Sequence, residues 1–266
     1  MLPFRSGNYH GLIQSGLPSG VVQLVADLDQ ADKLAGARRV LSGQLRTIWE
    51  LAAEDGSTYF VHLFRNPRRH LVPRILHVHG SMRRLQIPTF EVVAAGYGTA
   101  RRSRRQFLVT RKIEGAVSLP AGLGHRYEVV PEAVEVSQHL ARSLAKFISD
   151  FHRKAVIHGD LKSRHILLHP GTQQFYLVDL EKSRRLGLLP QFLMDVLRVR
   201  DLIQLSASCS HCITNLQKVR FLRHYLRELC ACSVRRRTFY FVLRLYSDHN
   251  FPQGRTLLQN VMAALQ

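Results

Sequence analysis

The sequence contains no long apolar run. None of its stretches approaches the roughly 18 consecutive apolar residues that a transmembrane helix needs, and its start, Met-Leu-Pro-Phe-Arg-Ser-Gly, lacks the apolar core of a signal peptide. Internal repeats and low-complexity segments are also missing, while the hydrophobic content of 45% is typical of a folded chain. We therefore expect a cytoplasmic globular protein. Its 266 residues suffice for one large domain or for two lobes that share a cleft.

Acidic residues are scarce as well. The chain has 19 Asp and Glu against 38 Lys and Arg, which gives a formal net charge of +19. Such a charge suits an anionic membrane, a phosphorylated glycolipid or a nucleic acid. A solvated surface without a partner is the alternative that composition leaves open. The basic residues are spread along the chain, in clusters at Arg65–Arg69, Arg83–Arg84, Arg101–Arg105, Lys182–Arg185 and Arg235–Arg237.

Cysteine is equally rare, with only four residues in the chain. Cys209 and Cys212 have a spacing that metal sites use, and Cys230 and Cys232 follow about twenty residues later. Both pairs lie in segments with helical patterns, where the thiols of Cys230 and Cys232 point to different faces. We favour buried thiols in a reducing compartment; a zinc site is the alternative.

The pattern of apolar residues changes near residue 113. Residues 1–37 are weakly periodic and predict an irregular arm with one strand at most. Residues 38–113 predict strands at 39–41, 47–51, 58–64, 90–97 and 106–110 and a basic helix over 68–87. Residues 114–266 are mainly helical, and one apolar face recurs at Leu140, Leu144, Phe147, Ile148 and Phe151. Further helices are predicted around 196–205 and 221–229 and at 238–246 and 254–265. A β-rich part followed by a helical part predicts the α+β class.

Residues 156–182 carry the clearest chemical pattern. Asp160 follows an apolar pair, His165 comes five positions later, and two short apolar runs around a Pro-Gly turn lead to Asp179. Two strands joined by that turn would hold both carboxylates at the same end of a hairpin. Phosphoryl transfer needs one carboxylate to orient the attacking hydroxyl and another to hold the metal on the phosphates. An ordinary hairpin with two surface Asp residues is the alternative.

The same residues resemble a kinase catalytic loop and metal loop. His158-Gly159-Asp160 stands where kinases have His-Arg-Asp, and Val178-Asp179-Leu180-Glu181 stands where they have Asp-Phe-Gly. His165 replaces the metal-binding Asn, which is similar to the bacterial lipopolysaccharide core kinases of the Kdo/WaaP/InaA group. This resemblance implies a bilobal protein-kinase-like fold with a β-rich N-lobe over 38–113 and a mainly helical C-lobe over 114–266.

The resemblance also implies roles for the residues of this region. Asp160 would orient the acceptor hydroxyl, and Lys162 would neutralise the transferred phosphoryl group. Asp179 and His165 would hold Mg²⁺ on ATP. The remaining two residues would support the loop: His158 would brace it, and Asp201 would hydrogen-bond it from a following helix.

The N-lobe departs from the family pattern. Gly43 would lie in the loop that covers the phosphates, and Lys112 in the hinge that meets adenine. His62 stands where the family has a Lys in the third strand. No Lys occurs between Lys33 and Lys112 and no Glu between Glu54 and Glu91, so both members of an ion pair are missing. Arg65 is a candidate substitute; otherwise His62 is a strand histidine in a lobe that clamps ATP weakly.

The resemblance implies an ATP-dependent phosphotransferase that acts on a sugar hydroxyl, of heptose or Kdo, in the lipopolysaccharide inner core. Its partners would be the core or a lipid A precursor and the anionic surface of the inner membrane, to which the protein would bind peripherally on the cytoplasmic side. The alternative is a kinase-fold pseudoenzyme that binds nucleotide, glycolipid or protein. A nucleic-acid-binding module is a third reading, but none of its usual sequence patterns occurs, so no nucleic acid is expected.

Overall fold

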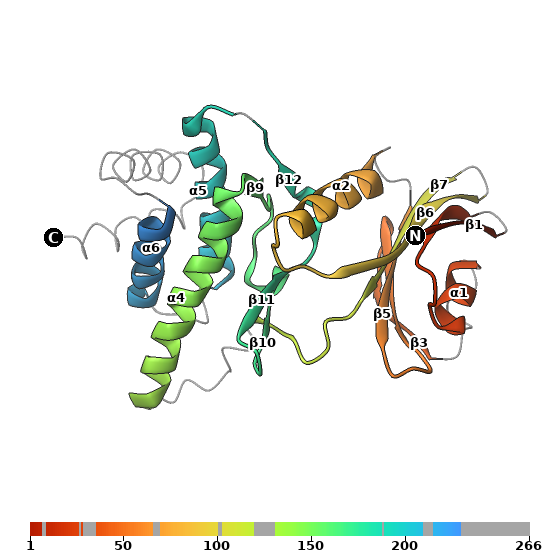
Figure 1. Ribbon diagram of the computed structural model, residues 1–266, viewed down its shortest axis with the longest axis horizontal. Helices are drawn as coiled ribbons and strands as arrows, with labels where there is room; N and C mark the ends of the chain where they lie inside the picture. Colours follow the sequence, from red (N-terminus) through yellow and green to blue (C-terminus); the bar gives the residue numbers. More distant parts are fainter. Residues whose placement is uncertain are drawn as a thin grey trace. The chain divides into compact units, whose positions relative to one another are not determined.

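The computed structural model describes residues 1–6, 9–26, 28, 36–65, 70–100, 103–119, 131–187, 189–209 and 215–229 (Figure 1). Residues 99, 100, 103, 131–138, 215 and 216 are described by their backbone alone. The chain divides into two compact units. The first contains Met1–His77 and Thr89–Gly115, and the second contains Val78–Pro88 and Ala116–Gln266. The first unit therefore ends two residues after the boundary that the sequence predicts near residue 113.

The first unit is built on a seven-stranded antiparallel sheet of order β1-β2-β6-β7-β5-β4-β3. One short helix, α1 (Ser19–Ala26), follows the first two strands. The strands are β1 (Leu2–Ser6), β2 (Tyr9–Ile13), β3 (Ala37–Ser42), β4 (Arg46–Ala52), β5 (Thr58–Arg65), β6 (Glu91–Ala100) and β7 (Ser103–Arg111). The five strands predicted in 38–113 are all present.

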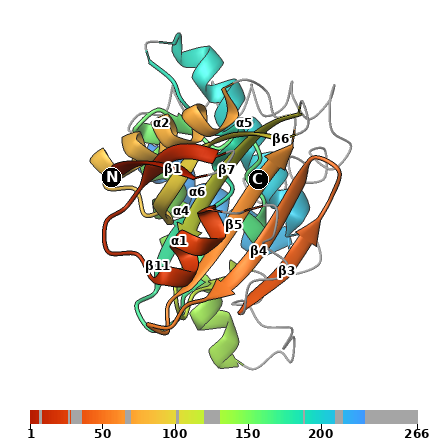
Figure 2. The ribbon, with the colours of Figure 1, turned by 90° about the vertical axis from the view of Figure 1, so that its right-hand side faces the viewer.

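Alternation along the strands decides which face of this sheet is the core. Tyr59, Val61 and Leu63 of β5 are buried on one face, because successive side chains of a strand point to opposite sides. The same core contains Leu24 and Val25 of α1, which lies against that face (Figure 2). The intervening residues of β5 belong to the opposite face.

The prediction of an irregular arm over residues 1–37 is wrong for the described part of that segment. Strands β1 and β2 form a hairpin, and β2 extends the sheet by pairing with β6. Gly11 and Gly96 lie in register there, and a Cβ on either would clash with the backbone of the other strand. The pairing joins residues more than 80 positions apart, so the local sequence pattern carries little sign of it.

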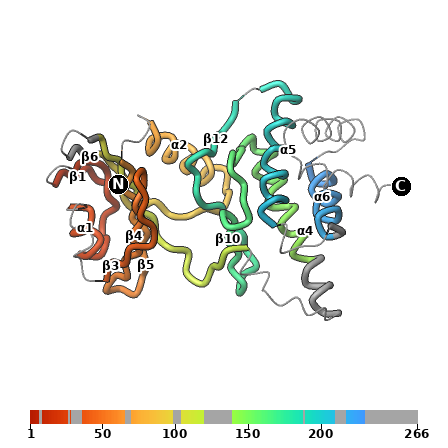
Figure 3. The backbone as a smooth tube through the Cα atoms, turned by 180° about the vertical axis from the view of Figure 1, so that it is seen from behind, coloured from red at the N-terminus to blue at the C-terminus, as the bar shows by residue number. Residues whose placement is uncertain are grey.

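The second unit is mainly helical. Helix α2 (Leu71–Arg84) begins in the first unit and ends in the second, close to the helix predicted over 68–87. The other helices are α4 (Pro131–Arg153), α5 (Gln191–Ser208) and α6 (Asn215–Leu229). Helices α4 and α6 pack side by side (Figures 1 and 3). Of the apolar face predicted for α4, Leu140, Leu144, Ile148 and Phe151 are buried and Phe147 is half-buried.

Short strands and turns complete the second unit. Strands β10 (Ile166–His169) and β11 (Gln174–Leu177) form the hairpin that the sequence predicts, and β8 (Val117–Ser118) pairs with β10. Strands β9 (Val156–Ile157) and β12 (Arg184–Arg185) pair with each other. Two single 3₁₀ turns, η2 (Ser163–His165) and η3 (Leu180–Lys182), flank the hairpin.

Some predictions fall on residues that the structure does not describe. The helices predicted at 238–246 and 254–265 lie outside the described residues, as do Cys212, Cys230 and Cys232. Cys209 is described, and it is buried and carries no disulfide. Across the described ranges, no helix has both the length and the apolar character needed to cross a bilayer.

Candidate active site

The loop from His158 to His165 lies between β9 and β10, and its tight entry depends on glycine. Gly159 has a φ of +76°, in the left-handed region that favours glycine. A Cβ at this position would lie 2.6 Å from the carbonyl oxygen of Lys182. Position 159 therefore suits Gly, where kinases have Arg, because the chain after Asp179 passes directly against it. Asp179 itself adopts a left-handed conformation with φ 60° and ψ 63°.

Asp201 of α5 anchors the start of this loop. Its carboxylate, which is fully buried, accepts hydrogen bonds from the backbone N–H groups of His158 at 2.8 Å and Gly159 at 2.9 Å. His152 Nε2 also contacts it at 3.3 Å, and Tyr225 of α6 lies 2.7 Å from His152 Nδ1. Burial holds the pKa of His152 below its ordinary value, against the opposing effect of Asp201. His152 is therefore neutral; its Nε2–H donates to Asp201 and its Nδ1 accepts from Tyr225, as the partners require.

Two further residues of α5 hold the middle of the loop, and the sequence analysis missed them. The backbone N–H of Leu161 donates to Gln204 Oε1 at 3.1 Å, and that of Ser163 donates to Ser208 Oγ at 2.8 Å. Gln204 and Ser208 follow Asp201 at i+3 and i+7, on one face of the helix. This spacing of polar residues on an otherwise apolar helix face is the sequence signal that could have identified them.

His158 is a structural residue of the loop. Its Nε2–H donates to the carbonyl of Val178 at 3.0 Å, which ties this loop to the residue before Asp179. Burial lowers its pKa, although the charge of Asp201 opposes that shift, so the ring is neutral. Ser183 Oγ donates to the His158 carbonyl at 3.1 Å from the chain beyond Asp179.

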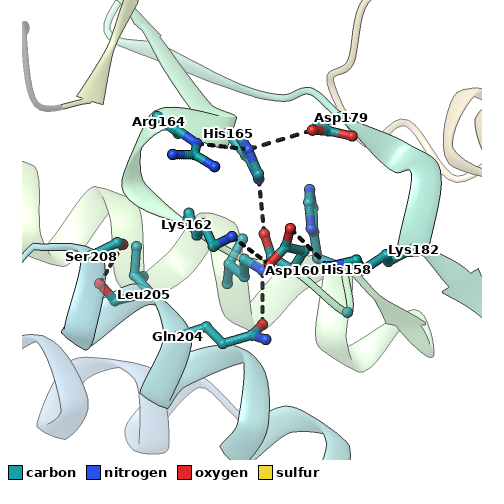
Figure 4. Close-up of polar contacts among 12 residues, drawn as sticks. His158, Asp160, Lys162, Arg164, His165, Asp179, Lys182, Gln204, Leu205 and Ser208 are labelled. Atoms are coloured by element: carbon teal, nitrogen blue, oxygen red, sulfur yellow. Dashed lines mark hydrogen bonds and ion pairs between the residues drawn. The ribbon is translucent and has the colours of Figure 1, made fainter. Parts of the chain in front are cut away.

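His165 contacts both carboxylate-bearing segments (Figure 4). Its Nδ1–H donates to the Asp160 carbonyl at 2.9 Å, and its Nε2 lies 3.5 Å from Asp179 Oδ2. Arg164 Nε donates to the same Nε2 at 3.2 Å. The hairpin thus brings the two motifs together at one end, as its sequence predicts.

The Asp160 carboxylate is held by two lysines. Lys162 Nζ lies 3.0 Å from Oδ1 and Lys182 Nζ lies 3.3 Å from Oδ2. Partial burial acts to raise the pKa of Asp160, but the hydrogen bonds and charges of the two lysines outweigh it and hold the pKa below its ordinary value. Asp160 is therefore ionised at neutral pH. Lys182, like Gln204 and Ser208, is a contact that the sequence analysis did not predict.

The described residues include no group of three or more His, Cys, Asp and Glu side chains that could hold a metal ion by themselves. Mg²⁺ does not need such a group in nucleotide sites, because one or two carboxylates plus substrate phosphates and water complete its shell. Asp179 fits that requirement. His165 fits it less well, because imidazole is a poor ligand for Mg²⁺ and Arg164 already donates to its Nε2.

The three predicted residues of the β-rich part lie in the first unit. His62 stands in the middle of β5, opposite Ile48 of β4 and Leu108 of β7. Lys112 Nζ pairs with Glu50 Oε1 at 3.1 Å. Gly43 donates its N–H to the Arg46 carbonyl at 2.9 Å in the β3–β4 turn. A Cβ on Gly43 would make an ordinary contact, so this turn does not require glycine.

Arg65, the candidate substitute for the missing Lys, ends β5. Its Nη1 donates to Thr47 Oγ1 at 2.6 Å and to the Gly43 carbonyl at 3.3 Å. Its guanidinium is therefore held on the β3–β4 hairpin. Helix α2 contains no acidic residue, in agreement with the sequence.

Comparison with known proteins identifies the group to which these motifs belong. Residues 63–225 match the Lipopolysaccharide kinase (Kdo/WaaP) family. The chain belongs to this family. It is accordingly a lipopolysaccharide core kinase, which is a phosphotransferase with an alcohol group as acceptor. A search of curated protein sequences found no match to the chain.

Solved structures agree on the fold. A WaaP in complex with acyl carrier protein has a TM-score of 0.65 at 21% identity, covering 94% of this chain and 98% of that chain. An aminoglycoside-3'-phosphotransferase of type VIII has a TM-score of 0.52 at 16% identity, covering 91% and 99%. The amicoumacin kinase hAmiN, in complex with AMP-PNP, Ca²⁺ and Ami, has a TM-score of 0.50 at 12% identity, covering 90% and 92%. These neighbours confirm the predicted kinase-like α+β fold.

Proposed function

We propose that this family member transfers a phosphoryl group from ATP to a sugar hydroxyl, of heptose or Kdo, in the lipopolysaccharide inner core. The observation that carries the proposal is the arrangement around His165, which touches the Asp160 carbonyl with one ring nitrogen and faces Asp179 with the other. The same loop is pinned by Asp201 through two backbone hydrogen bonds. A loop held so firmly keeps a carboxylate in one position, which phosphoryl transfer requires.

In this proposal Asp160 orients the acceptor hydroxyl. Its lowered pKa makes it a weak base, but a loose phosphoryl-transfer transition state asks mainly for positioning, because the hydroxyl proton leaves late. Lys162, on Oδ1, neutralises charge on the transferred group.

Asp179 is the residue that we propose to hold Mg²⁺, with His165 beside it. When bound, the metal would neutralise the phosphate charge of ATP. Within the protein, the left-handed turn at Asp179 and the bond from His158 to the Val178 carbonyl set the direction of the Asp179 carboxylate.

The first unit would supply the remaining contacts to ATP. We propose that Gly43 and Arg65 lie near the phosphates and that the backbone around Lys112 meets adenine. His62 in the place of Lys, together with a helix that lacks Glu, supports weaker nucleotide binding than in kinases that keep this pair. The same absence supports the second candidate function, a kinase-fold pseudoenzyme that binds nucleotide or glycolipid without turnover.

We also propose that the protein binds peripherally to the cytoplasmic face of the inner membrane, where its acceptor would lie. The β3–β4 hairpin supports this, because Val40, Leu41 and Leu45 are exposed beside basic residues. Exposed aliphatic side chains flanked by cations suit an anionic lipid surface. A protein partner is the other possibility for this surface, since the similar WaaP is described in complex with acyl carrier protein.

The test is a phosphorylation assay with the purified full chain. ATP and Mg²⁺ are combined with Kdo-bearing lipid A precursors, with and without heptose, and the mass of the product is measured. A gain of one phosphate that disappears in Asp160→Asn supports the kinase. ATP binding with no product on any acceptor supports the pseudoenzyme.

A further inference from the structure

The two lysines on Asp160 differ in exposure. The Lys162 side chain is 34% exposed and pairs with Oδ1, whereas the Lys182 side chain is 63% exposed and pairs with Oδ2. They reach the carboxylate from opposite sides (Figure 4). An acceptor hydroxyl that binds Asp160 must share a carboxylate oxygen with one of these ammonium groups or displace it. Lys182 is the easier to displace, because a more exposed ion pair is more strongly screened by water.

The backbone of Lys182 is nevertheless fixed. Its carbonyl packs against Gly159, and the next residue, Ser183, is buried and donates to the His158 carbonyl. Beyond it, Arg184 pairs with Ile157 in the β9–β12 ladder. Only the side chain of Lys182 is left free to move, so the reach of its ammonium group is defined by a rigid attachment next to the catalytic loop.

The charges around Asp160 do not balance. One carboxylate faces two ammonium groups, so this group of three carries a net charge of +1. Arg184 and Arg185, which follow Ser183 in the chain, are also exposed. Lys162 alone would neutralise Asp160. The second cation is therefore available for an anion that arrives from solvent.

We propose that Lys182 is an acceptor-binding residue that recognises an anionic oxyacid group, a phosphate or a carboxylate, on the sugar acceptor. The inference rests on the proposed function, in which Lys162 lies toward the transferred phosphoryl group. The opposite side of Asp160, where Lys182 lies, is then the side of the acceptor. On acceptor binding, the ammonium of Lys182 leaves Asp160 Oδ2 and pairs with the anion, and Oδ2 becomes free to accept the hydroxyl hydrogen bond.

The movement couples recognition to catalysis. A neutral sugar gives Lys182 no anion to pair with, so Asp160 Oδ2 stays occupied and the hydroxyl competes with an ammonium group for it. An anionic acceptor removes the competitor and adds an ion pair at the same time. Lys182 would thus discriminate between acceptors of equal shape and different charge.

The test measures acceptor kinetics with the full chain and three acceptors. These are a Kdo-bearing lipid A precursor, the same lipid after removal of its lipid A phosphates, and the same lipid after reduction of its Kdo carboxyls to alcohols. The variants are Lys182→Met, Lys182→Arg and the control Lys146→Met, which removes an exposed lysine of α4 in the same unit. Lys182→Met should raise the KM for the intact acceptor roughly 10- to 100-fold, as expected for a lost charge-assisted contact.

The acceptors then identify the anion. Removing the group that Lys182 recognises should raise the wild-type KM by a similar factor and abolish the difference between wild type and Lys182→Met. Lys182→Arg should keep the preference for the anionic acceptor, and Lys146→Met should match wild type. An equal effect of Lys182→Met on all three acceptors, or a rise in the KM for ATP in place of that for acceptor, would overturn the inference.

A binding measurement separates this inference from the proposed function. Lysines are ¹³C-methylated, and the Lys182 signal is assigned by its loss in Lys182→Arg. Inorganic phosphate or acetate, added without ATP, should shift that signal more than the signal of Lys146. If wild type phosphorylates none of the acceptors, the proposed function fails, while the shift still supports the anion site. An unmoved Lys182 signal overturns the anion site whatever the assay shows.

Discussion

Replacement of Asp201 is the sharpest test of how the site is built. Its buried carboxylate accepts from the N–H groups of His158 and Gly159 and from His152 Nε2. Asp201→Ala leaves all three buried donors without that acceptor. Three lost bonds to a charged group would sum to roughly 4.5–9 kcal/mol at 1.5–3 kcal/mol each. The substitution also removes a buried charge whose desolvation opposes folding, so we expect a net loss of about 3–5 kcal/mol.

Asp201→Asn should be milder. The amide oxygen can stand in for Oδ2 and keep His158 and His152, but the amide NH₂ then faces the N–H of Gly159. One bond is lost and one donor is left unsatisfied, which costs about 1–3 kcal/mol. Gly159 precedes Asp160, so a loop that shifts by about 1 Å should lower kcat by about 10²-fold.

The assay combines denaturant unfolding, kcat and amide hydrogen exchange of His158 and Gly159. Tyr225→Phe is the matched control, because it removes only the hydroxyl that donates to His152 Nδ1. It should cost about 1–3 kcal/mol and leave kcat and loop protection near wild type. Asp201→Asn should lower both kcat and the amide protection of the loop. If the two variants lose equal stability and Asp201→Asn keeps wild-type kcat and amide protection, the anchoring role of Asp201 is refuted.

Four other predictions concern Asp160, the metal, the buried histidines and the membrane. Asp160→Ala should leave the fold intact and abolish phosphoryl transfer; a folded variant with near wild-type turnover contradicts the assigned role. ATP binding, measured by calorimetry, should depend on Mg²⁺, and that dependence should vanish in Asp179→Ala; metal-independent binding in wild type would show the metal assignment to be mistaken. His152 and His158 are buried with lowered pKa values, so below about pH 6.5 the unfolded chain binds protons that the folded chain does not. The free energy of unfolding should therefore be constant above that pH and should fall by up to about 2.7 kcal/mol per pH unit below it. Denaturation at pH 7.5 and at pH 5.5 measures this difference. Binding to anionic vesicles, measured by co-sedimentation, should weaken from 0.1 to 1 M salt, because the Debye length falls from about 10 to about 3 Å. The variant Leu45→Glu should bind these vesicles more weakly than wild type. Equal binding to neutral and anionic vesicles would exclude this mode of membrane association.

The β10–β11 hairpin shows what could be predicted locally. Its register runs from Ile166 opposite Leu177 to His169 opposite Gln174, around a turn that contains Pro170 and Gly171. The pairs between its two strands join residues within about a dozen positions of one another. Apolar runs, turn residues and strand length therefore suffice to predict the hairpin and the common end at which His165 faces Asp179.

The N-terminal strands show the opposite case. β2 gains its structure by pairing with β6, where Gly11 and Gly96 allow the backbones to approach. Nothing in residues 1–37 alone indicates that partner, because a strand of five residues becomes stable only within a sheet. The helix α1 likewise depends on the sheet face that its Leu24 and Val25 cover.

Local spacing along the chain established the order of the kinase motifs, the α+β class and the loss of the Lys and Glu pair, since each is a matter of which residues stand at which interval. The tertiary structure decided which side chains converge on Asp160. Gln204 and Ser208 reach the loop from about 45 positions away, and Lys182 returns to Asp160 only because Gly159 lets the two segments touch. Contacts of that kind depend on how α5 and the chain after Asp179 pack, which a one-dimensional pattern does not encode.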